Sequence, residues 1–268
     1  MEDLQDLLKS EDLKELESKD ISLRFRKIAE TLMCNYVIKK GEKEYAIIEI
    51  EFYLYSPSHR DYITYPREIE AGRWFFHQSG VDLTFKSFNV KDIKKVENEK
   101  QRFSEATFGG ILIRGLYRFS FKDEEQKEQE AKYIFGPQNC VSELWDNFDA
   151  FNYTAQEYPI LALALKDEKK FQSTNPIPYK RHIKIGKDKA IEIKEKEWAE
   201  RIGIPLSNQR GEEKSKENIK IETVDSAMID TLEAKYRFFN IIDGENTWNA
   251  IKHLTKTEKN DLKKLIQG

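Results

Sequence analysis

The chain has 268 residues and a formal net charge of −3, with 35% charged, 39% hydrophobic and 12% aromatic residues. This composition is enough for a folded core, and the sequence contains no apolar run of the length that a signal peptide or a membrane span needs. The net negative charge argues against a strongly basic nucleic-acid-binding domain. Together with two cysteines that lie far apart, these features predict a cytoplasmic protein with reduced thiols and no membrane association.

Basic residues are unevenly distributed along the chain. Lysines and arginines gather in residues 86–102 and 166–196. A basic cleft within an otherwise acidic protein would bind DNA weakly and without sequence specificity, because phosphate contacts come mainly from clustered lysine and arginine. The alternative is a solvated charged face without a ligand, and the sequence leaves both interpretations open.

The first fifth of the chain is predicted to form two helices and two strands. Leucines at helical spacing predict a helix over 3–17. Ser22 is a good N-cap residue and predicts the start of a second helix that ends near Met33. Alternating apolar residues then predict strands over 35–40 and 46–54.

The remainder is predicted to be a mixture of strands and shorter helices. Apolar runs bounded by turn residues predict strands at 73–78, 81–88, 109–122, 131–135, 182–186, 190–194 and 236–241. Helical patterns predict helices at 137–146, 195–202, 225–233 and, appended at the C-terminus, 246–266, with a polar excursion at 205–224. Long crossover helices are too few for a doubly wound parallel sheet. We therefore predict an α+β protein, a single mixed domain over residues 1–268 built on a curved, mostly antiparallel β-sheet with flanking helices.

The strand near residue 50 carries an unusual set of polar side chains. Because side chains alternate along a strand, Glu49, Glu51 and Tyr53 are expected on one face, opposite an apolar face made by residues 48, 50 and 52. A carboxylate beside an aromatic ring suits a general base next to a flat substrate. The alternative is a half-buried strand whose polar face meets solvent.

Several well-known chemistries have no counterpart in the sequence. Phosphate-binding and dinucleotide-binding glycine motifs are absent, as is the Gly-x-Ser-x-Gly motif of many hydrolases. The four histidines and two cysteines show no metal-ligand spacing. If the protein is an enzyme, the sequence predicts hydrolysis without a metal or a cofactor.

Six short motifs occur in an order that is familiar from one enzyme family. The first is Glu-x-Glu-x-Tyr-Leu at 49–54, and the others lie at 72–80, 110–116, 136–144, 201–204 and 236–239. In this order, across about residues 21–240, the chain resembles the alkyladenine (3-methyladenine) DNA glycosylase family. The resemblance implies a monofunctional glycosylase, a hydrolase that flips a damaged base out of double-stranded DNA, cleaves the N-glycosidic bond and leaves an abasic site for base-excision repair. It also implies a monomer that needs no cofactor.

The resemblance assigns roles to particular residues. Glu51 would be the catalytic base that activates water, and Arg114 would contact the nucleotide. Tyr53, His59 and Phe76 would line the pocket that holds the flipped base. Gln78 and Ser79 would fill the gap in the DNA, where the family has a tyrosine.

Departures from the family pattern bear on the substrate. Ser79 is a small polar wedge, and the bulky Phe52 and Tyr55 stand where the family has small residues. A remodelled pocket would take a different lesion or an enzymatically modified base. Two other classes stay open, a non-catalytic nucleic-acid-binding module and a protein-interaction module on the same fold.

Overall fold

The computed structural model describes residues 3–61, 63–97, 99–123, 125–146, 158–164, 175–181, 234–242 and 244–267. Several expected elements lie outside these residues, namely the strands at 182–186 and 190–194, the helices at 195–202 and 225–233, and the polar excursion at 205–224. None of the helices within the described residues is long and apolar enough to cross a membrane.

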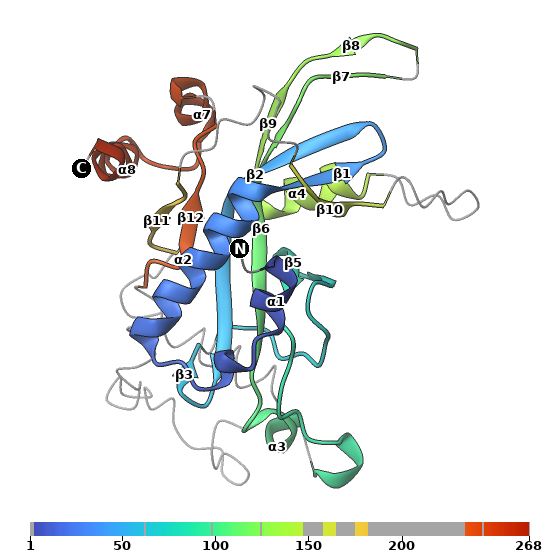
Figure 1. The fold of residues 1–268 in the computed structure, drawn as a ribbon, viewed down its shortest axis with the longest axis vertical. Coiled ribbons are helices and arrows are strands. Elements are labelled where there is room, and N and C mark those ends of the chain that lie inside the picture. The colour runs from blue at the N-terminus through green and yellow to red at the C-terminus, as the bar shows by residue number, and fades with distance from the viewer. Residues whose placement is uncertain are drawn as a thin grey trace, which may run out of the picture.

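One antiparallel sheet organises the described part of the chain, which confirms the expected α+β class (Figure 1). Its main strands follow the order β10 (Ile160–Leu163), β1 (Tyr36–Lys40), β2 (Lys43–Ser56), β6 (Phe108–Arg118), β5 (Gly80–Thr84) and β4 (Trp74–His77). Four further strands join it, β3 (His59–Arg60), β9 (Lys132–Phe135), β11 (Ile177–Tyr179) and β12 (Arg237–Phe239). The predicted strands 109–122 and 131–135 correspond to β6 and β9, which pair with each other, and a separate two-stranded pair, β7 (Phe121–Lys122) and β8 (Glu128–Gln129), lies in the connection between them.

The two longest strands, β2 and β6, form the centre of the sheet, and their pairing is irregular at one place. Glu49 lies opposite Gly115, but Ile50 lies opposite Ile113, so Arg114 is an extra residue in β6. A second shift next to Ile47 interrupts the alternation of β2. Ile48 consequently packs with Ala46 and Phe119, apart from the cluster of Ile50 and Phe52, which corrects the expectation that residues 48, 50 and 52 share one face.

The helices differ from the expected ranges at their ends. The N-terminal helix over 3–17 is instead α1 (Leu4–Lys9) followed by the short helix η1 (Glu11–Lys14). Helix α2 (Ser18–Asn35) begins one turn earlier than expected, so Ser22 is not its cap. The remaining helical segments are η2 (Ile93–Lys95), α3 (Glu99–Phe103), α4 (Pro137–Leu144), α7 (Gly244–Ala250) and α8 (Lys256–Gln267).

The C-terminal segment forms two helices where one was expected. The first helix ends at Ala250, and Thr255 caps the second, because its hydroxyl accepts a hydrogen bond from the Glu258 amide at 3.2 Å. The Glu258 carboxylate accepts one from the Thr255 amide at 2.8 Å. This reciprocal capping box starts a new helix and leaves residues 251–255 as a short turn between α7 and α8.

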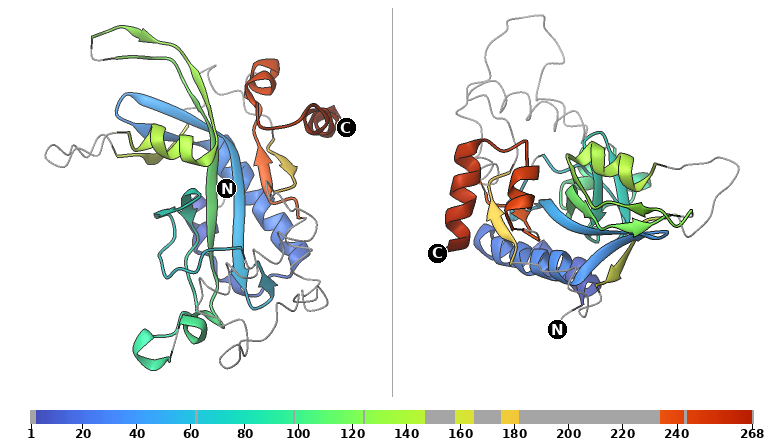
Figure 2. Two further views of the ribbon diagram at one scale, coloured as in Figure 1. Left: turned by 180° about the vertical axis from the view of Figure 1, so that it is seen from behind. Right: turned by 90° about the horizontal axis from the view of Figure 1, so that it is seen from above.

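Helix α2 covers one face of the sheet, crossing obliquely in front of β2 (Figure 1). The ring of Phe25 on α2 stacks on Phe52 at 4.4 Å and meets the edge of Tyr236 at 4.8 Å. The two C-terminal helices stand together at one side of the sheet (Figure 2). They pack through Trp248 and Leu262 against Phe239 of β12.

We expect the Phe25 stack to contribute strongly to stability. Phe25 is fully buried, so Phe25→Ala should lower the free energy of unfolding by about 3–5 kcal/mol, the sum of lost burial and the cavity left behind. Leu23 on the same helix is 68% exposed, and Leu23→Ala should change the free energy by less than about 0.5 kcal/mol. Urea denaturation of both variants measures the difference, and equal effects would contradict this assignment of the core.

Candidate functional site

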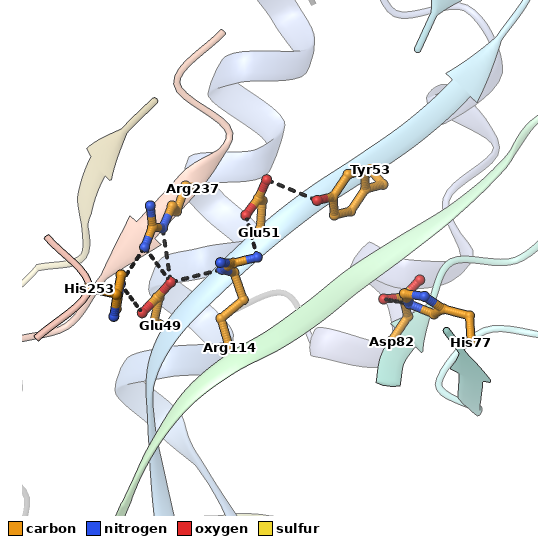
Figure 3. A network of polar contacts seen from close by, with 8 residues as sticks. All are labelled: Glu49, Glu51, Tyr53, His77, Asp82, Arg114, Arg237 and His253. Carbon is orange, nitrogen blue, oxygen red and sulfur yellow. Dashed lines mark hydrogen bonds and ion pairs between the residues drawn. The ribbon is translucent and has the colours of Figure 1, made fainter. Parts of the chain in front are cut away.

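Two carboxylates of β2 are buried on the same side of the sheet (Figure 3). Glu49 is 1% exposed and Glu51 is fully buried. Removing a carboxylate from water is costly unless a cation and hydrogen bonds replace the solvent. The groups around these two side chains therefore determine whether they can stay ionised.

Arg114 is the cation that both carboxylates share. Its Nε donates to Glu49 Oε1 at 2.9 Å, and its Nη1 lies 3.1 Å from Glu51 Oε2. Burial disfavours the charge of Arg114, but the carboxylates of Glu51 and Glu49 outweigh that effect and raise its pKa. The neighbouring Gly115 is required here, because a Cβ at that position would lie 2.9 Å from Glu49 Cβ. The irregular pairing of β6 thus places a guanidinium between two acids.

Arg237 and His253 complete the surroundings of Glu49. Arg237 donates to Glu49 Oε1 through Nε at 2.9 Å and through Nη2 at 2.6 Å, and His253 Nε2 lies 3.2 Å from Glu49 Oε2. Burial alone would raise the pKa of Glu49, but the hydrogen bond from His253 and the charges of Arg237 and Arg114 lower it to about 2. Glu49 is therefore an anion at neutral pH.

Tyr53 lies on the other side of Glu51. Its hydroxyl donates a hydrogen bond to Glu51 Oε1 at 2.9 Å. Burial and the Glu51 charge raise the pKa of Tyr53, so the phenol stays protonated and keeps donating. The other oxygen, Glu51 Oε2, is buried and accepts no hydrogen bond from any residue that the structure describes. One oxygen of Glu51 is thus fixed, and the other is held only by charge.

A buried ion pair covers the ring of Tyr53. Arg181 donates to Asp61 Oδ1 at 3.1 Å and to Asp61 Oδ2 at 2.8 Å. Its guanidinium lies 5.1 Å from the centre of the Tyr53 ring and 4.9 Å from the centre of the Tyr236 ring. One face of Tyr53 is therefore occupied by a cation.

The structure places His59 apart from Glu51. His59 pairs with Ser56 across the turn from β2 to β3, and its buried ring meets Tyr236 at 5.6 Å. Burial is the main cause that lowers the pKa of His59 to about 4, so the ring is neutral at neutral pH. The ring that His59 meets is thus Tyr236, and Arg181 contacts both Tyr236 and Tyr53, the predicted stacking ring.

The expected position of Phe76 beside Glu51 is wrong by one residue. Directly paired residues share a face of the sheet. Glu51 pairs with Leu112 of β6, Leu112 pairs with Asp82 of β5, and Asp82 pairs with Phe75 of β4. Phe76 therefore lies on the opposite face, where its ring meets Trp145 at 4.8 Å. A one-residue shift in a strand moves a side chain to the other face.

The tip of the β4–β5 hairpin carries Gln78 and Ser79, and both are exposed. Gln138 of α4 donates a hydrogen bond to the Gln78 carbonyl at 2.5 Å. A Cβ at Gly80 would lie 2.8 Å from Pro137. The tip is thus packed against the start of α4.

A second polar cluster shares the face of Glu51. Asp82 accepts from Arg67 Nη1 at 2.7 Å and pairs with His77 Nε2 at 3.0 Å. The Arg67 guanidinium lies 4.0 Å from the centre of the Phe75 ring. Arg67 lowers the pKa of Asp82 against the opposing effect of burial. Figure 3 shows Asp82 and His77 of this cluster together with the group around Glu49 and Glu51.

A cavity of about 930 Å³ lies beside β9 and α4. Arg114 and His253, which both contact Glu49, are among its lining residues. Arg114 is the only predicted site residue in the lining of this cavity. The resemblance predicts one cleft that is lined by Glu51, Tyr53, His59, Phe76 and Arg114. This cavity is not that cleft, because four of the five residues do not line it. Glu51 is nevertheless in direct contact with Tyr53 and Arg114.

Sequence reasoning missed most of the partners of the acid pair. Arg237 and His253 are far from β2 in the sequence, and Arg181 and Asp61 form their pair over 120 residues. The motif at 236–239 contained a signal, since it places an arginine in a short apolar strand. No sequence signal marks His253.

Within the described residues, no group of three or more histidine, cysteine, aspartate or glutamate side chains could hold a metal ion. Comparison of the chain with models of protein families, with curated proteins and with solved structures finds no match. The site must therefore be interpreted from its own geometry and chemistry.

The low pKa of Glu49 predicts a loss of stability in acid. The folded pKa of about 2 lies below the ordinary 4.5. The ionised group therefore stabilises the fold fully above pH 4.5, and this contribution disappears as the pH falls towards 2. Between pH 4.5 and pH 2, the free energy of unfolding should fall by roughly 3 kcal/mol more in the wild type than in Glu49→Gln, and urea denaturation measures the difference.

Glu49→Gln also leaves two buried arginines with a weaker partner, so it should be less stable at neutral pH. A carbon-detected NMR titration of the wild-type carboxylates provides an independent measurement. A Glu49 pKa near 4.5 in the folded protein would contradict the ionised pair.

Proposed function

We propose that this protein is a monofunctional DNA glycosylase of the alkyladenine type, in which Glu51 activates the water that cleaves an N-glycosidic bond. The observation that supports this most is the state of Glu51, whose Oε1 is held by Tyr53 while Oε2 accepts no hydrogen bond from the described residues. A buried carboxylate oxygen that is held by an ion pair alone can accept a hydrogen bond from a water molecule. We further propose that the protein acts as a monomer in the cytoplasm, without a metal or a cofactor.

The proposed reaction uses the charge of Glu51 as well as its basicity. As the base departs, the sugar develops the positive charge of an oxocarbenium ion, which a nearby carboxylate stabilises. Glu51 would take the proton from the attacking water through Oε2 and face the sugar. Arg114 would keep the carboxylate in place, because it contacts Glu51 Oε2 at 3.1 Å and is itself fixed by Glu49.

Tyr53 is the candidate for stacking on a flipped base. Its ring is partly exposed, and its hydroxyl is fixed by Glu51. A base that stacks on the ring face now covered by Arg181 would have to displace that guanidinium. Glu51 itself is fully buried, so substrate access requires a movement of neighbouring groups.

Phe75 is too far from Tyr53 to stack on the other side of the same base. Phe75 replaces Phe76 on the correct face, but three strand spacings separate it from β2, which is roughly 14 Å. A single base is too thin to contact Tyr53 and Phe75 together. This supports the idea that the substrate differs from an alkylated purine gripped between two rings.

A non-catalytic DNA-binding module is the second candidate. The full burial of Glu51 and its ion pair with Arg114 favour it, because both features reduce the access of a nucleotide to the carboxylate. The two proposals differ in whether any modified base is excised.

The test is excision by wild type and by Glu51→Gln on duplex oligonucleotides that carry a panel of alkylated and otherwise modified bases. Abasic sites are scored by alkaline strand cleavage. Glu51→Gln should lower the single-turnover rate by a factor on the order of 10²–10⁴, as expected for loss of a general base, while DNA binding persists. The fold should survive, because Arg114 keeps its bond to Glu49.

Glu44→Gln is the matched control, since Glu44 is on the same strand and its side chain is 39% exposed. It should leave the rate unchanged. Glu49 is unsuitable as a control because it shares Arg114 with Glu51. Full activity of Glu51→Gln would refute the assignment, and a wild type that binds the duplexes but excises no base would favour the second candidate.

A further inference from the structure

The cavity beside Arg114 and His253 lies where the sheet divides. Strand β6 pairs with β5 through Leu112 and with β9 from Gly115 onwards. Arg114 falls between the two pairings, and its carbonyl accepts a hydrogen bond from the Gly136 amide at 2.8 Å. The division of the sheet thus leaves a cavity of about 930 Å³, bordered by β9, α4 and the turn between α7 and α8.

The cavity is basic although the protein is acidic. Its two acids, Glu143 and Asp146, are each paired with two cations. The lining side chains and their ion-pair partners comprise four carboxylates, Glu49, Glu51, Glu143 and Asp146, and six cations, Lys40, Lys43, Arg114, Arg118, Lys132 and Lys252. Lys252 forms no ion pair with any described residue. The excess of positive charge favours an anionic ligand.

Aromatic side chains add a flat apolar surface to this basic cavity. The rings of Tyr133 and Phe135 on β9 line it, both are partly exposed, and their planes differ by 1°. Cations interleaved with exposed aromatic rings are typical of sites that bind nucleotides, since the phosphate meets the cations and the base stacks on a ring. The volume also fits a ligand much larger than a phosphate ion.

We propose that this cavity is a nucleotide-binding site. Lys132, Lys252 and Arg114 would contact the phosphate, and Tyr133 or Phe135 would stack on the base. The chemistry is the same for a free mononucleotide and for a nucleotide within a single DNA strand. The cavity shares Arg114 with Glu51, but nucleotide binding there does not require that Glu51 hydrolyses a glycosidic bond.

The experiment compares the binding of two probes, deoxyadenosine 5′-monophosphate and a five-nucleotide single-stranded DNA, by isothermal titration calorimetry at low salt. The wild type should bind at least one of them, and the preferred probe identifies the source of the nucleotide. The double variant Lys132→Glu/Lys252→Glu should bind it on the order of tenfold more weakly, with a shallower dependence on salt. Both lysines are exposed, so the fold should persist.

Two matched variants separate the cavity from the overall charge. Lys27→Glu/Lys264→Glu changes the net charge equally at exposed positions of α2 and α8, and it should bind like the wild type. Ser142→Trp keeps every charge but places a large ring at an exposed position in the lining, and it should weaken binding to a similar extent as the double variant. The proposal is overturned if the wild type binds neither probe, or if both double variants weaken binding equally.

Discussion

The neutralisation of two buried carboxylates is the constraint on which the centre of this protein depends. Glu49 and Glu51 are delivered by one strand to the same side of the sheet, and neither is accessible to water. Taking an ionised carboxylate out of water costs several kcal/mol unless a cation compensates. Arg114 from β6 and Arg237 from β12 provide that compensation from opposite neighbours of β2. The ion pairs therefore stabilise the placement of β6 and β12 beside β2, in addition to compensating the buried charges.

The same arrangement limits the chemistry that Glu51 can perform. Glu51 is in contact with an arginine and a tyrosine hydroxyl, which fix its carboxylate in one position, and a fixed carboxylate stabilises positive charge that develops beside it. Among hydrolytic reactions, those with a cationic transition state benefit most from such a group, and cleavage of an N-glycosidic bond is one of them. Ester or peptide hydrolysis, in which negative charge develops on the substrate, would be hindered by Glu49 and Glu51.

The sequence predicted the local structure well and the long-range structure poorly. The position of strand β2 and the Pro137 start of α4 depend on neighbouring residues, and both were predicted within a few positions. The irregular pairing at Arg114 and the turn register that exchanges Phe75 for Phe76 depend on partner strands, which no single sequence reveals. Glu51 is in contact with Tyr53 and Arg114, as the motifs predicted. The sequence did not predict the contacts that Arg237, His253 and Arg181 make with this group. Their contacts arise only when the distant C-terminal segments pack on the sheet.

The separation of Glu49 from Arg237 along the chain, 188 residues, has a consequence for biosynthesis. During translation β2, β6 and α2 become available long before β12, so the early sheet contains two carboxylates with Arg114 as their only nearby arginine. Pairings over such a distance also close slowly, because the entropy of a long loop must be overcome before the contact forms. Until Arg237 arrives, the site remains hydrated and the sheet incomplete, and the C-terminal segment acts as the last structural component of the fold. A protein assembled in this order completes the surroundings of Glu49 only after Arg237 and His253 have been made.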